Sequence, residues 1–171
     1  KMMDALKDMN IKRFLLPDTL GILTPLETLE YIHQMVTRYP GQWFDFHAHN
    51  DYDMAVGDSL AAVKGGAKGL HVTVNGLGER CGNAPLASVE VMLKDQMHIE
   101  TNIEEDRLNE ISRLVAGYSG IAVAPNQPVV GENVFTQVAG VHADGDRKDH
   151  LYSNALVPER FGRKREYALG K

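Results

Sequence analysis

Three short apolar segments, each followed by a polar cluster and then by a helical pattern, constrain the fold of this chain more than any other feature. The apolar segments and the helices that follow them lie at residues 12–16 and 25–39, 43–46 and 54–64, and 69–74 and 85–94. Strands that alternate with helices of about 10 to 15 residues are typical of a parallel sheet. The sequence therefore predicts an α/β fold with three consecutive βα units.

The polar clusters fall where each predicted strand ends. They are residues 18–19, 47–51 and 75–83. Because the carboxyl ends of parallel strands meet at one edge of a sheet, we expect these clusters to form a single site. Three strands alone make a poor open sheet. We therefore expect either a part of a larger barrel or open sheet, or pairing with another copy, and we expect the 171 residues to be an excerpt of a longer protein.

Composition and charge exclude several classes of protein. The hydrophobic fraction is 43% and the charged fraction 24%, as in ordinary globular chains. No apolar run approaches the roughly 18 residues of a membrane helix, and no signal peptide is evident, so we expect a soluble protein. The net charge of -5 argues against nucleic acid or an anionic membrane as the main partner. The single cysteine, Cys81, fits a reducing compartment such as the cytoplasm.

Two histidines, His47 and His49, are two residues apart at the end of the second predicted strand. On a strand this spacing places both rings on one face, where they could bind one metal ion. Imidazole suits zinc, manganese, iron or cobalt. The alternative is two histidines with ordinary hydrogen bonds, but the strand end and the following Asn50 and Asp51 favour a metal site.

The loop of residues 75–83 contains three glycines, yet it lacks the complete GxGxxG fingerprint, so a phosphate-binding role is the less favoured alternative. Asn83 could supply an oxygen ligand to the metal ion. Glu79 and Arg80 are expected to pair with each other or with neighbouring loops. Cys81 is a weak candidate for a nucleophile, because a small packed thiol is the commoner role of a single cysteine.

The C-terminal part has a different pattern. Residues 103–118 form an expected amphipathic helix, and residues 121–132 a loop marked by proline and glycine. His142 and Tyr152 are types that transfer protons, although their spacing alone indicates two ordinary polar residues. A basic cluster is expected to be a solvated face or a surface for an acidic partner or a cofactor phosphate; it consists of Arg160, Arg163, Lys164 and Arg165.

Four motifs together resemble the 2-isopropylmalate, citramalate and homocitrate synthase family. They are LPDTLG at residues 16–21, FHAHND at 46–51, NGLGERCGN at 75–83 and GVHADG at 140–145. This family belongs to a group of metal-dependent barrel enzymes that also includes hydroxymethylglutaryl-CoA lyase. The resemblance implies that residues 1–100 are the last three βα units of a (β/α)8 TIM barrel. Residues 101–171 would then be a mostly helical extension and linker segment.

The resemblance also implies roles for particular residues. The divalent ion, either zinc, magnesium or manganese, would be bound by His47, His49 and Asn83. Thr19 would contact the carboxylate of a 2-oxo acid. His142 with Tyr152 would act in the deprotonation of acetyl-CoA.

Two departures from the family pattern stand out. Cys81 replaces an expected small residue such as alanine. The Arg-Asp-Gly-Glu motif of the first barrel strand, whose aspartate is a metal ligand in the family, does not occur in the sequence. We therefore expect this chain to be inactive by itself.

The activity implied is a Claisen condensation. The leading expectation is that acetyl-CoA condenses with 3-methyl-2-oxobutanoate to give 2-isopropylmalate and CoA, a step of leucine biosynthesis. The alternatives are citramalate formation from pyruvate and, from another class, a non-catalytic metal-binding or interaction module; a lyase is less favoured. The expected assembly is a cytoplasmic homodimer with subdomain exchange, without nucleic acid or membrane partners.

Overall fold

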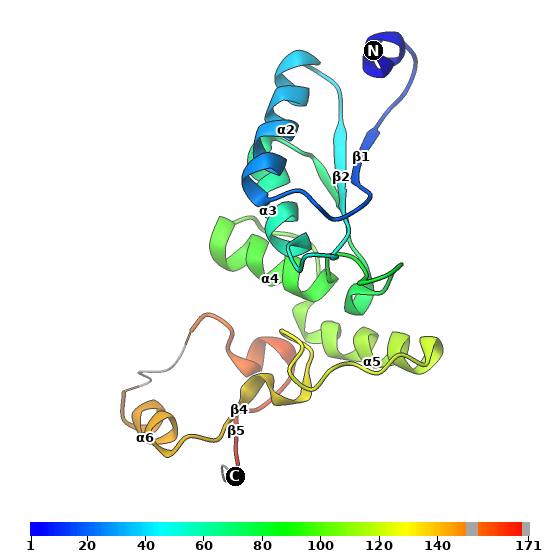
Figure 1. Ribbon diagram of the computed structural model, residues 1–171. Coiled ribbons are helices and arrows are strands. Elements are labelled where there is room, and N and C mark those ends of the chain that lie inside the picture. Colours follow the sequence, from blue (N-terminus) through cyan, green and yellow to red (C-terminus); the bar gives the residue numbers. More distant parts are fainter. Residues whose placement is uncertain (150–153, 169–171) are drawn as a thin grey trace. The chain divides into compact units, whose positions relative to one another are not determined.

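The computed structural model describes residues 1–149 and 154–168 of the chain (Figure 1). The chain divides into two compact units, Lys1–Val89 and Glu90–Lys171, and each is considered by itself. The division expected near residue 100 remains a prediction.

The first unit contains a parallel sheet in the order β1-β2-β3. The strands are β1 (Phe14–Asp18), β2 (Phe44–Ala48) and β3 (Gly69–His71), preceded by the short helix α1 (Met2–Leu6). Helices α2 (Pro25–Arg38) and α3 (Ala55–Gly65) run beside the sheet, and α4 (Leu86–Met97) begins in this unit (Figure 1). The three predicted βα units are therefore present.

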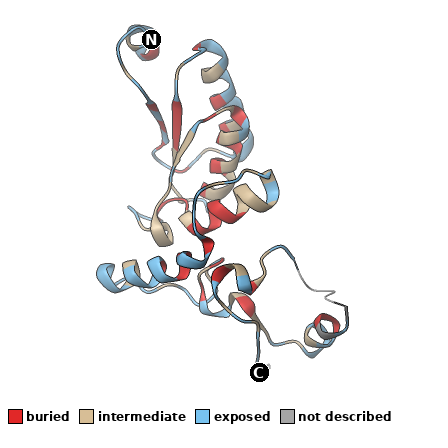
Figure 2. Cartoon of the chain, turned by 180° about the vertical axis from the view of Figure 1, so that it is seen from behind, coloured by how far each residue is buried: buried red, intermediate tan, exposed pale blue. Residues whose placement is uncertain are grey.

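Local sequence signals explain the helix boundaries. Thr24 caps α2 through a capping box, in which the Glu27 amide donates to the Thr24 hydroxyl and the Thr24 amide donates to the Glu27 carboxylate. Gly66 ends α3 in a left-handed conformation. Buried residues line the facing sides of the sheet and helices (Figure 2), and Phe44 and Ile32 are fully buried.

The strand ends differ from those expected. Strand β1 starts at Phe14 and continues to Asp18, because its pairing with β2 extends through Pro17 and Asp18. Strand β3 ends at His71 and not at Val74, because a 3-10 turn, Val74–Gly76, follows. The first two polar clusters thus begin on the strands themselves, at Asp18 in β1 and His47 in β2, whereas residues 75–83 follow the end of β3.

The second unit is mostly helical. Its elements are the 3-10 turn η2 (Glu105–Arg107), α5 (Leu108–Ser119), η3 (Glu132–Phe135), β4 (Thr136–Gln137), α6 (Gly140–Asp149), η4 (Pro158–Phe161) and β5 (Glu166–Tyr167). Strands β4 and β5 pair in parallel. The rings of Phe135 and Phe161 stack with their centroids 5.8 Å apart, and Phe161 is almost fully buried.

The expectation of one helix over residues 103–118 was wrong at its start. Glu104 has extended backbone angles, residues Glu105–Arg107 form a 3-10 turn, and α5 begins only at Leu108. In the part of the chain that the structure describes, no helix is long and apolar enough to cross a membrane.

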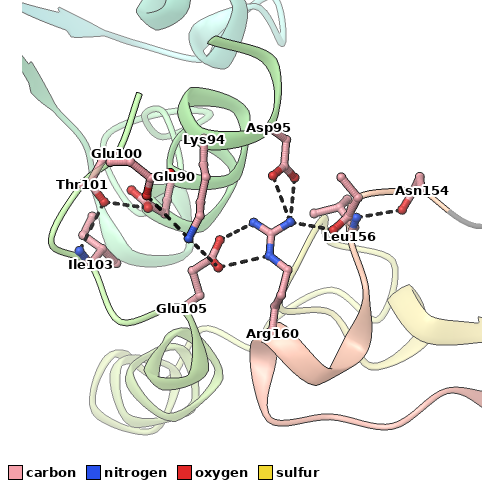
Figure 3. Close-up of polar contacts among 11 residues, drawn as sticks. Glu90, Lys94, Asp95, Glu100, Thr101, Ile103, Glu105, Asn154, Leu156 and Arg160 are labelled. Carbon is pink, nitrogen blue, oxygen red and sulfur yellow. Dashed lines mark hydrogen bonds and ion pairs between the residues drawn. The ribbon is translucent and has the colours of Figure 1, made fainter. Parts of the chain in front are cut away.

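An ion cluster holds the end of α4, η2 and η4 together within the second unit (Figure 3). Arg160 donates to both carboxylate oxygens of Asp95, at 2.9 and 3.0 Å, and to both of Glu105. Lys94 lies 3.3 Å from Glu105. These hydrogen bonds, led by that from Arg160, lower the pKa of Glu105.

Candidate metal and substrate site

His47 and His49 lie at the carboxyl end of β2, and both are half-buried. Their ring centroids are 4.9 Å apart with the rings nearly perpendicular, as expected of residues that share one face of a strand. An isolated antiparallel bridge pairs His49 with Asn83. The structure thus brings together the three residues that the sequence predicts as metal ligands.

Each of these three residues has a buried polar atom without a hydrogen-bond partner among the described residues. The atoms are Nδ1 of His47, Nδ1 of His49 and Oδ1 of Asn83. Buried polar atoms are nearly always paired, so three unpaired atoms on adjoining residues need an explanation. Imidazole nitrogens and an amide oxygen are suitable ligands for a divalent cation, and the donor set therefore fits a metal ion.

Within the described part of the chain, no carboxylate joins the two histidines as a third ligand. Among the residues described, no group of three or more histidine, cysteine, aspartate or glutamate side chains could hold a metal ion. The chain itself supplies two imidazoles and one amide, which leaves coordination positions for other ligands.

The surroundings of His47 favour its neutral form. Burial, followed by the charges of His49 and His71, lowers the pKa of His47, although a hydrogen bond with the His71 backbone opposes the shift. The neutral imidazole is the form that binds metal ions. Sequence reasoning missed His71, whose ring centroid is 6.0 Å from that of His47. The β2–β3 register pairs these two residues, and this register has no clear local signal in the sequence.

The loop of residues 75–83 fixes the position of Asn83. The side-chain amide of Asn83 donates to the Leu77 carbonyl at 3.0 Å, and its backbone amide donates to the Gly76 carbonyl at 2.9 Å. A Cβ atom at Gly78 would collide with the amide nitrogen of Asn83. The glycine at this position therefore lets the Asn83 side chain approach the loop backbone, with its oxygen left for a ligand.

Thr19 is exposed directly after β1, at the same edge of the sheet. The carboxylate of Asp18 accepts hydrogen bonds from the amides of Ile22 and Leu23, at 3.2 and 3.0 Å, which fixes the turn around Thr19. The Thr19 carbonyl accepts a hydrogen bond from Arg80 at 2.8 Å.

The residues beside the candidate ligands have supporting roles. The Asn50 side chain accepts a hydrogen bond from the Ala55 amide at 3.1 Å, at the start of α3. Asp51 forms a two-pronged ion pair with Arg80, and this pairing lowers the pKa of Asp51. The expectation that Arg80 pairs with a neighbouring loop is therefore confirmed. Cys81 is a free, exposed thiol.

Of the pair His142 and Tyr152, the structure describes only His142. His142 is exposed in the first turn of α6, in the second unit. Tyr152 lies outside the described residues. Their joint role remains a prediction.

The expectation of a solvated basic face was wrong for most of its members. Arg160 belongs to the ion cluster, and Arg163 donates to the carbonyls of Gly131 and Glu132. Arg165 lies 2.7 Å from the buried Asp146. Of the four basic residues, Lys164 alone is exposed. The three arginines are partly buried because each contacts acceptors within the chain's own fold.

Solved structures first identify the class of fold. The chain superposes on hydroxymethylglutaryl-CoA lyase of Bacillus subtilis with a TM-score of 0.66 and 23% identity, over 75% of this chain and 44% of that one. The corresponding enzyme of Pseudomonas aeruginosa gives a TM-score of 0.63 and 22% identity, over 71% and 42%. The chain therefore has the α/β fold of these lyases.

The sequence then identifies the family. The HMGL-like family model matches residues 1–115, and the chain belongs to this family. Homocitrate synthase of Sulfolobus acidocaldarius is 44% identical over 167 residues, which are 98% of this chain and 36% of that protein. Homocitrate synthase of Sulfurisphaera tokodaii is 40% identical over 171 residues, 100% of this chain and 37% of that one. The resemblance drawn from the motifs is thus confirmed, and the chain spans about a third of these relatives.

Proposed function

We propose that this chain is part of an enzyme that condenses acetyl-CoA with a 2-oxo acid. The observation that carries the proposal is the set of three unpaired buried atoms on His47, His49 and Asn83, beside Thr19 at one sheet edge. The similarity to homocitrate synthases supports the reaction class.

In this proposal His47, His49 and Asn83 hold a divalent ion, which is zinc, magnesium or manganese. When bound, such an ion supplies a Lewis acid for the ketone oxygen of the 2-oxo acid. The Thr19 hydroxyl donates a hydrogen bond to the substrate carboxylate, and charge-assisted bonds of this kind are comparatively strong. His142, oriented by Tyr152, accepts a proton from the methyl group of acetyl-CoA.

The 2-oxo acid is a separate question. Because the relatives are homocitrate synthases, we place 2-oxoglutarate first, since its condensation with acetyl-CoA gives homocitrate. The leading expectation from the motifs, 3-methyl-2-oxobutanoate, becomes the second candidate, and pyruvate the third. We further propose a homodimer in which the C-terminal extension serves the partner's barrel.

An assay of CoA release by the full-length protein tests this function. Acetyl-CoA is supplied with 2-oxoglutarate, 3-methyl-2-oxobutanoate or pyruvate, and free thiol is measured over time. We expect the greatest kcat/KM with 2-oxoglutarate. Thr19→Ala should raise KM for the oxo acid by roughly 10- to 150-fold, as the loss of a hydrogen bond to a charged group implies. If none of the three oxo acids stimulates CoA release, the proposed function is wrong.

A further inference from the structure

Arg80 connects all three βα loops at the candidate site. Its own loop follows β3, its guanidinium forms a two-pronged pair with Asp51 in the loop after β2, and it also donates to the Thr19 carbonyl in the loop after β1. The three distances are 2.7, 3.0 and 2.8 Å. One side chain thus bonds to two other loops through a rigid, planar group.

The conformation of Arg80 is unusual for such a residue. Its φ is 52°, in the left-handed region that non-glycine residues rarely adopt. The Arg80 and Asp51 side chains are 39% and 21% exposed, and their two parallel hydrogen bonds fix the guanidinium in one orientation. A residue held in a sparsely populated backbone conformation beside a candidate site points to a role of this residue in the site.

The contacts around this pair lead directly to the candidate ligands. The Asn50 amide donates to the Gly82 carbonyl at 2.9 Å, which joins the second loop to the third beside Asn83. A Cβ atom at Gly21 would lie 2.9 Å from the His49 carbonyl, so the first and second loops also approach closely. A change at Arg80 would therefore be transmitted to each loop that carries a candidate site residue.

We propose that Arg80 and Asp51 form a clasp that positions Thr19, His49 and Asn83 for ion and oxo-acid binding. Arg80 is a positioning residue, since it reaches the site through Asp51 and the Thr19 carbonyl. This inference rests on the proposed function.

The test compares Arg80→Ala, Asp51→Ala and the double variant in the full-length protein. The readouts are Mn2+ affinity by calorimetry, and KM and kcat for the oxo acid from CoA release. Each single variant should lower Mn2+ affinity and raise KM by about tenfold, the lower end of what supporting residues of metal sites contribute. The double variant should be no worse than either single one, since both break the same clasp.

An effect of the Arg80 charge alone on cation binding would give a different result. Loss of the positive Arg80 should strengthen cation binding if only the charge matters, whereas loss of the clasp should weaken it. Arg80→Lys keeps the charge without the two-pronged geometry, so it should recover only part of the affinity. Arg38→Ala is the matched control, because it breaks another arginine–aspartate pair, with Asp4, and should leave both readouts within twofold.

Several outcomes would overturn the clasp. The first is that Arg80→Ala keeps Mn2+ affinity and KM within twofold of wild type. The second is that this variant binds Mn2+ more tightly. The third is that the double variant loses Mn2+ affinity by the product of the two single losses. If Arg80→Ala does not fold, Arg80→Lys decides, because it keeps the charge: Mn2+ affinity and KM within twofold of wild type in this variant would contradict the clasp. If the wild type binds Mn2+ but releases no CoA, the proposed function fails while the Mn2+ measurements still decide on the clasp; if it does neither, both proposals fail.

Discussion

Asp58 in α3 is a charged residue type in a fully buried position. The buried hydroxyl of Thr28 in α2 faces this carboxyl group and favours its ionised form, but burial and the charge of Asp18 outweigh that effect. Burial, together with the charge of Asp18, raises the pKa of Asp58 to about 6. A buried carboxyl group of this kind is stable in its neutral form, so ionisation opposes folding.

Replacing Asp58 with asparagine should therefore stabilise the protein in a pH-dependent way. The unfolded carboxyl ionises near 3.8 and the folded one near 6, so stability falls as the pH rises between these values. A shift of this size corresponds to a cost of about 3 kcal/mol above pH 6. Asp58→Asn should gain about 2 kcal/mol more at pH 8 than at pH 4 in urea unfolding. The control is Asp8→Asn, at an exposed position outside the helices and strands. An equal effect of Asp58→Asn at both pH values would contradict this explanation.

Gly78→Ala tests how the loop positions the Asn83 side chain. The added Cβ collides with the amide nitrogen of Asn83, which must then move. We expect Mn2+ affinity of the full-length protein to fall by roughly tenfold or more. Gly117→Ala is the control, since nothing lies within 4 Å of its Cβ in α5, and it should stabilise the helix by about 0.5 to 1 kcal/mol without changing Mn2+ affinity. Unchanged affinity in Gly78→Ala would mean that the collision is relieved elsewhere.

Residue-scale prediction from the sequence succeeded where a local pattern carries the information. The spacing of His47 and His49 directly predicts two rings on one face. The pairing of Arg80 with a neighbouring loop was expected and is confirmed, but its bond to the Thr19 carbonyl depends on a left-handed backbone angle. The position of His71 beside His47 depends on strand register, and neither of these features has a clear local signal. The sequence therefore did not predict how Arg80 and His71 lie relative to the candidate ligands.

At the scale of elements, helix starts were predictable when a capping signal was present. Thr24 and Pro25 mark the start of α2, and the structure shows both the cap and the proline in the first turn. The start of α5 carries no such signal, because no side-chain cap bond forms at Arg107. Apolar periodicity alone extended that helix too far.

The ion cluster around Arg160 gives a prediction for the second unit. Arg160→Ala leaves the nearly buried Glu105 and Asp95 without this partner, and we expect a loss of about 3 kcal/mol at pH 7. The lowered pKa of Glu105 contributes stability above about pH 4.5 that is lost as the pH falls further, so the loss should shrink in acid. Hydrogen exchange of residues 154–163 measures it. Exchange as slow as in wild type at pH 7 would show that the cluster does not hold this segment.

At the scale of the whole molecule, the repeated strand and helix pattern predicted the parallel sheet, and the structure shows its order to be β1-β2-β3. Alternating βα units leave few alternatives, because consecutive parallel strands joined by helices tend to lie side by side. The pairing of β4 with β5 could not be predicted in this way, since each strand has two residues and their partners lie about thirty residues apart in sequence. The HMGL-like family model matches residues 1–115 and confirms the family, whereas the position of these units within a (β/α)8 barrel remains a prediction.

The central claim is that His47, His49 and Asn83 bind a divalent ion in the complete protein. The most direct test is a Mn2+ titration of the full-length protein, its His47→Ala and His49→Ala variants, and the control His33→Ala, which removes an exposed histidine from α2. We predict that each ligand variant loses more affinity than the roughly 10- to 100-fold typical of supporting residues, while the control matches wild type. Equal Mn2+ affinity in all four proteins would contradict the metal site and the function proposed from it.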